Sequence, residues 1–212
     1  MSRPSSRTPC TPVCRWRSTR ALVIGAALLP LAAAGPAESP DAAVQQLYAH
    51  VVARRPLGIP RGADKEALWP LLSKRLARQL DDARACEADY DARPSEIEKP
   101  PLPWREQGLF SGPNERAEPT EVTVERTEPM GKGTRVFVRF SFSEVVDTYS
   151  RRESSGPRFR WPGAVLVKTE GGRFVVDDVE LLKEPSNTIE SRLSGLFAGC
   201  DGPRWAGDGG PK

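Results

Sequence analysis

The chain has 212 residues, with 31 basic and 28 acidic side chains and a formal charge of +3. This excess comes from the first 20 residues, which hold five arginines and no acid. Without them, 26 basic and 28 acidic side chains give a net charge of −2, which removes the electrostatic basis for nucleic-acid binding.

The arginine-rich start leads into an apolar run, ALVIGAALLPLAAAG. A basic region, a short apolar core and small residues at its end are typical of a secretory signal peptide. We expect this signal peptide over residues 1–34, with cleavage after Ala34 or as late as Ala37. A membrane anchor is the alternative, but the run is shorter than the roughly 20 residues of a spanning helix and contains Pro30. The sequence predicts a periplasmic or secreted protein with no stable membrane insertion after cleavage.

The rest of the chain is long enough for one domain with its own core, which we expect over residues 38–200. A tail rich in Gly and Pro follows over 201–212, and we expect it to be disordered. Cleavage leaves two of the four cysteines, Cys86 and Cys200. An even number of cysteines in a chain bound for an oxidising compartment predicts a disulfide between them. Two separate buried thiols are the alternative.

A first helix is predicted from Pro40 to about Arg54. Ser39 can cap it, and Pro40 suits the first helical position, where its missing N–H costs nothing. Its apolar stripe consists of Val44, Leu47, Tyr48 and Val51. His50, the only histidine, lies on the shoulder of that stripe.

A second helix is predicted to start between Lys65 and Pro70 and to end near Asp89. Its leucines and Cys86 share one buried face, because Cys86 lies five full turns after Leu68. A proline-rich loop over 92–119 follows. We expect three side chains to pin this loop to the core: Trp104, Leu109 and Phe110.

Beyond residue 120 the apolar positions alternate, which predicts an antiparallel sheet with one face more buried. One hairpin spans 120–142, with Arg135 and Arg139 on its more polar face. A second hairpin spans 159–182 around the turn EGG. Ser186 then caps a short helix predicted over 187–197.

These elements form an α+β pattern, with helices on one face of a curved antiparallel sheet. The pattern resembles the nuclear-transport-factor-2-like (SnoaL-like) superfamily, in particular its bacterial exported members of unknown function. The resemblance is carried by Val44–Val51, the leucines of the second helix, Arg135–Phe142 and Gly171–Val179. It implies a cone-shaped fold with a pocket between sheet and helices. It implies no activity, because that superfamily holds enzymes, binding modules and assembly domains.

The residue types oppose most catalytic centres. A single histidine and two cysteines that are expected to form a disulfide are too few ligands for a metal site. The same histidine would be the only base for a serine hydrolase, and the sequence has no G-x-S-x-G turn. Dinucleotide-binding and Walker loops are missing from the sequence, so no cofactor is expected. Within the resemblance, His50 or Asp177 could act as the acid or base of a dehydratase- or isomerase-like enzyme. We favour a non-catalytic exported domain that binds a small ligand or an envelope protein.

Candidate ligand-binding residues come from the expected pocket: Tyr48, His50, Trp104, Trp161 and Asp177, with Phe110 near its mouth. The aromatic residues are alternatively plain core. Neighbours in a strand point to opposite faces, so Asp177 and Asp178 should not converge unless a bulge intervenes, and Asp178 is expected to be a solvated or strand-end acid. His50 and Asp177 within hydrogen-bond reach would favour an enzyme. A filled cone with an exposed apolar patch would favour a partner-binding domain.

Overall fold

The computed structural model describes residues 35, 37–92, 102–105, 108–111, 119–142 and 159–200. The expected signal peptide over 1–34 and the expected tail over 201–212 lie outside these ranges. In chain order the elements are α1 (Pro40–Arg54), α2 (Gly62–Leu68), the 3₁₀ turn η1 (Trp69–Leu71), α3 (Lys74–Ala92), β1 (Glu121–Met130), β2 (Gly133–Phe142), β3 (Phe159–Glu170), β4 (Arg173–Lys183), β5 (Thr188–Arg192) and the 3₁₀ helix η2 (Leu193–Phe197).

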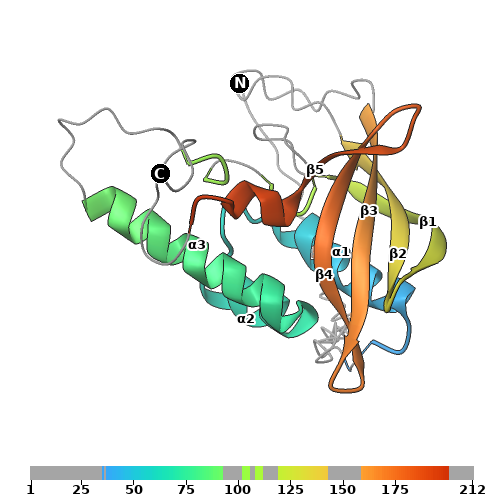
Figure 1. The fold of residues 1–212 in the computed structure, drawn as a ribbon, viewed down its shortest axis with the longest axis horizontal. Coiled ribbons are helices and arrows are strands. Elements are labelled where there is room, and N and C mark those ends of the chain that lie inside the picture. Colours follow the sequence, from blue (N-terminus) through green and yellow to red (C-terminus); the bar gives the residue numbers. More distant parts are fainter. Residues whose placement is uncertain are drawn as a thin grey trace, which may run out of the picture. The chain divides into compact units, whose positions relative to one another are not determined.

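The described strands form one antiparallel sheet in the order β1-β2-β3-β4-β5, so each strand pairs with its neighbours in sequence (Figure 1). Both predicted hairpins are confirmed. Each turns on glycine, with a φ of 59° at Gly131 and of 58° and 77° at Gly171 and Gly172, a region that residues with a Cβ rarely adopt. The α+β class predicted from the sequence is therefore confirmed.

The first predicted helix is confirmed, since α1 spans Pro40–Arg54. The predicted cap is also present, because the N–H of Ala42 donates to the Oγ of Ser39 over 3.1 Å. For the second helix, a continuous helix from Lys65 is wrong, whereas the alternative start at Pro70 lies close to the observed start of α3 at Lys74. The chain breaks at Pro70, where it forms the 3₁₀ turn, and α3 begins afresh at Lys74. Proline has no N–H to continue a helix, and Ser73 supplies a new cap by accepting from the N–H of Leu76.

The helix predicted over 187–197 is also wrong. Residues Thr188–Arg192 instead pair with β4, in a register that puts Leu182 opposite Ile189 and Glu180 opposite Arg192. Backbone pairing at the open edge of β4 outweighs the apolar spacing on which the helix prediction depended. Only Leu193–Phe197 are helical, and Ile189 is exposed.

One face of the sheet and the helices share a single core. The sheet contributes alternate side chains: Val136, Val138, Phe140, Val165, Val167 and Val179. The predicted anchors of the proline-rich loop, Trp104, Leu109 and Phe110, are buried in the same core, so the pinning of this loop is confirmed.

The other face of the sheet carries a small cluster of Phe137, Ala164 and Leu182 beneath charged side chains. The guanidinium of Arg126 lies 3.5 Å from the ring centre of Phe137, which is a cation–π contact. Buried Glu180 is 2.7 Å from nitrogens of both Arg135 and Arg192. Arginine stems and their ion pairs therefore cover this face, in agreement with the placement of Arg135 predicted from the alternation.

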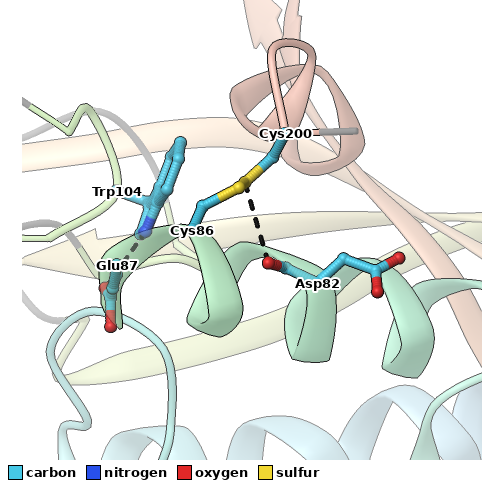
Figure 2. The surroundings of a disulfide bond; sticks show 5 residues. All are labelled: Asp82, Cys86, Glu87, Trp104 and Cys200. Carbon is cyan, nitrogen blue, oxygen red and sulfur yellow. Dashed lines mark hydrogen bonds between the residues drawn. A yellow bond between two sulfur atoms is a disulfide. The ribbon is translucent and has the colours of Figure 1, made fainter. Parts of the chain in front are cut away.

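Cys86 in α3 and Cys200, just after η2, lie at disulfide distance, with their Cα atoms 6.1 Å apart across 114 residues of sequence. Figure 2 shows the pair between α3 and the C-terminal turn, beside Trp104 and Glu87. Both cysteines are buried.

In the part of the chain that the structure describes, no helix has the length and apolarity needed to cross a membrane.

Candidate functional site

The aromatic residues predicted near a pocket mouth are mostly core. Tyr48 is buried, its hydroxyl donates to the carbonyl oxygen of Phe110 over 2.8 Å, and its ring meets Phe140 edge to face. Burial raises the pKa of Tyr48 far above its ordinary value. Trp104 has no exposed surface, and its indole N–H donates to Glu87 over 3.1 Å (Figure 2). These side chains are buried in the core between sheet and helices, where a ligand pocket was expected.

Trp161 differs from the other aromatic residues because it is only half-buried. It lies opposite Phe140 in the β2–β3 register. Its indole N–H is buried and has no hydrogen-bond partner within the described ranges. Trp161 is thus the one aromatic candidate whose polar atom is left unsatisfied there.

His50 projects from α1 to the start of α2. Its Nε2 lies 2.9 Å from the Oδ1 of Asp64, and the Nε of Arg54 lies 3.2 Å from the same oxygen. Burial raises the pKa of Asp64, but the hydrogen bonds from Arg54 and His50 outweigh it, so that the pKa lies below its usual range. This cluster joins α1 to α2, and Asp177 has no part in it.

Asp177 and Asp178 converge, because a bulge does intervene. Val167 pairs with Val176 and Leu166 with Asp178, which leaves Asp177 as the extra residue of β4. The Nη2 of Arg75 then lies 3.1 Å from the Oδ2 of Asp177 and 3.7 Å from that of Asp178.

Asp177 is further bound by the hydroxyl of Ser73 at 2.6 Å and by the Nζ of Lys168 at 2.8 Å. Its side chain is 22% exposed. Burial raises the pKa of Asp177, but the hydrogen bonds from Arg75, Lys168 and Ser73 lower it by more than burial raises it. The pKa of Asp177 therefore lies below its usual range. Asp177 is therefore held ionised, which makes it a poor proton donor at neutral pH.

The expectation that Asp178 is a solvated acid is wrong, since only 4% of the residue is exposed. Its Oδ1 accepts from the N–H groups of Val179 and Ser194, at 2.9 and 3.0 Å, and its Oδ2 accepts from the Ser194 hydroxyl at 2.5 Å. The buried carboxylate thus fastens η2 to β4, a role that requires the bulge and was not visible in the sequence.

A polar cavity of about 350 Å³ lies at the loop between α1 and α2, lined in part by Arg61, Asp64, Glu87 and Arg105. These charges are already matched. Arg61 is 2.7 Å from Glu87, and Arg105 is 2.8 Å from Asp91. Among the described residues, no group of three or more His, Cys, Asp or Glu side chains is arranged to hold a metal ion.

A second surface feature is an apolar groove of about 390 Å³ between α1 and β1. Its lining is Val44, Gln45, Tyr48, Ala49, Val52, Ala53, Thr120, Glu121, Val122 and Val124. Of the predicted ligand-binding residues, only Tyr48 reaches it. The sequence does carry a signal for this groove, a second stripe of small apolar residues on α1 at Ala49, Val52 and Ala53, but nothing local shows that β1 lies beside it.

Comparisons of the chain with protein-family models, with curated proteins and with solved structures found no match.

Proposed function

We propose that this protein is an exported, non-catalytic domain of the cone-shaped, nuclear-transport-factor-2-like type, and that it binds an envelope protein. The observation that carries the proposal is the burial of the aromatic residues that were expected to line a pocket. Tyr48, Trp104 and Phe110 are buried in the core, while an apolar groove is open at the surface. An exposed apolar groove is typical of a protein-binding surface.

The alternative, a dehydratase- or isomerase-like enzyme, depends on His50 or Asp177 as a free acid or base. His50 is bound to Asp64, and Asp177 to Ser73, Arg75 and Lys168. No contact between the two residues occurs within the described structure, so they do not form a joint acid–base site. This arrangement supports the binding domain over the enzyme.

Export is supported by the buried cysteine pair, since disulfides persist in oxidising compartments.

The packing at the start of the domain bears on the cleavage position. Ala37 is only 8% exposed within the core, and the carbonyl of Gly35 accepts from the Nε2 of Gln46 over 3.3 Å. Cleavage after Ala34 would keep both contacts, whereas cleavage after Ala37 would remove them. N-terminal sequencing of the mature protein should begin at Gly35, and an intact N-terminus in the cytoplasm would refute export.

Native mass spectrometry of the mature protein, purified gently from its own envelope, tests the binding function. We expect a complex with a second protein in a fixed ratio. A chain that carries a small molecule, or one that carries nothing, would contradict the proposal. The variant Val52→Glu, which puts a charge into the groove, should dissociate the complex, while Ala67→Glu on the exposed side of α2 should not.

A further inference from the structure

We infer that the groove between α1 and β1 binds an extended, basic segment of the partner protein, which joins the sheet as a strand beside Glu121–Val124. The inference rests on the proposed function and adds to it the binding mode and the class of segment.

β1 forms one edge of the described sheet. β1 stands first in the strand order and pairs only with β2 among the described strands. The backbone N–H and C=O groups on its other edge point away from the sheet. An extended chain is the structure that pairs with such an edge, and it gains affinity through main-chain hydrogen bonds.

There is room for an added strand beside that edge. α1 runs along β1, with Asp41 hydrogen-bonded to Thr127 near one end and Val52 and Ala53 beside Thr120 near the other. An added strand would lay every second side chain against this stretch of α1. The small side chains of Ala49 and Ala53 leave space for them, and half-buried Val122 and Val124 supply an apolar floor.

Only a short part of β1 is open to an added strand. The β1–β2 register shifts between Val124 and Arg126, which marks a bulge at Glu125, and Pro129 follows in the same strand. Bulges, charged residues and prolines on edge strands prevent further strand pairing. The second half of β1 is therefore protected, and Glu121–Val124 is the part left open to a short segment.

Negative side chains lie near both ends of the groove. Glu121 lines the groove, and Asp41, which accepts from the Thr127 hydroxyl, lies beyond the other end of the groove; neither forms an ion pair with a described residue. A basic segment complements this acidic rim. A second copy of this chain does not, because a two-fold contact would bring the same acidic rim against itself. The occupant is therefore a segment of a different protein, with alternating apolar residues and at least one Lys or Arg.

The test is photo-crosslinking in the native envelope, with the full-length protein carrying p-benzoylphenylalanine at position 52. The control carries it at the exposed Arg78 of α3. We expect adducts from position 52, and sequencing by mass spectrometry should identify an apolar and basic segment of another protein. Glu121→Lys should lower the yield roughly fivefold, as expected from loss of a surface ion pair. Glu66→Lys, on the exposed side of α2, should leave it unchanged.

An adduct to a second copy, to this chain itself or to an acidic segment would overturn the inference, and so would a yield indifferent to Glu121→Lys. Adducts from position 78 alone would refute the groove while the proposed function stands. No adduct from either position, together with no complex in native mass spectrometry, would refute both. Circular dichroism on each variant ensures that a lost adduct does not reflect an unfolded chain.

Discussion

At the scale of single residues, one extra position in β4 separates the roles of two adjacent acids. The bulge at Asp177 leaves this carboxylate partly exposed among Arg75, Lys168 and Ser73, while Asp178 is buried against Ser194. Both bind Arg75, so the start of α3, strand β4 and η2 meet at one guanidinium. A pair that looks catalytic in the sequence is a structural junction.

Replacing Asp178 with Ala should destabilise the protein by about 1–3 kcal/mol, because the N–H groups of Val179 and Ser194 lose their acceptor in a buried position. Urea unfolding followed by fluorescence measures the change. Glu190→Ala, at an exposed position of β5, is the control and should change stability little. Equal stability of the two variants would show that Asp178 does not anchor η2.

Asp177→Asn should change how stability depends on pH. Because the folded-state pKa of Asp177 is lowered, its ionised form stabilises the fold fully above the unfolded-state pKa of about 3.9, and this contribution is lost as pH falls through the folded-state value. The wild type should thus exceed the variant in free energy of unfolding at pH 7, and the gap should close below about pH 4. A gap that stays constant with pH would contradict the ion pairs of Asp177.

At the scale of elements, local patterns predicted what depends on neighbours in sequence. The hairpins follow from alternation and glycine turns, and α1 follows from its cap and apolar stripe. The end of the chain was not predictable in this way. Ile189, Leu193 and Phe197 have helical spacing, yet Ile189 pairs with Leu182 in a strand and is exposed. A tertiary partner overrode the local preference.

The candidate site was predictable only in part, for the same reason. Sequence reasoning singled out Asp177 and Tyr48, but the bulge depends on the register with β3, and the groove depends on α1 lying along β1. Trp104 was expected near a ligand and is instead a buried anchor, bonded to Glu87 of α3. Contacts between distant segments decided each of these outcomes.

Gly163 in β3 is closely surrounded by its neighbours in the sheet. A Cβ there would lie 2.4 Å from the ring of Phe140 and 3.2 Å from the carbonyl oxygen of Glu180. Gly163→Ala should therefore destabilise the protein by about 1–3 kcal/mol through overpacking, measured by thermal or urea unfolding.

Two variants make the overpacking test specific. Adding Phe140→Leu to Gly163→Ala should recover part of the lost stability, because the smaller side chain makes room for the new methyl group. Gly195→Ala, where a Cβ meets nothing within 4 Å, is the matched glycine control. Equal losses at positions 163 and 195 would point to backbone effects and would contradict the close approach to Phe140.

At the scale of the whole molecule, the cysteine pair connects the helical layer to the end of the chain. Cys86→Ser with Cys200→Ser should lower the free energy of unfolding by about 2–5 kcal/mol, as for native disulfides in small secreted domains. Urea unfolding of the wild type with and without reductant should show a loss of similar size. Peptide mapping without reductant should find the two cysteines linked, and free thiols at both positions would support the alternative of separate buried thiols.

The strand order has a consequence for how the chain is made. All pairs among the described strands join neighbours in sequence, so each hairpin can form as soon as its own residues are synthesised. Cys86, in contrast, must wait for a partner 114 residues later. This pair can therefore form only after residue 200 has been synthesised, and a product truncated before that residue could not form the disulfide.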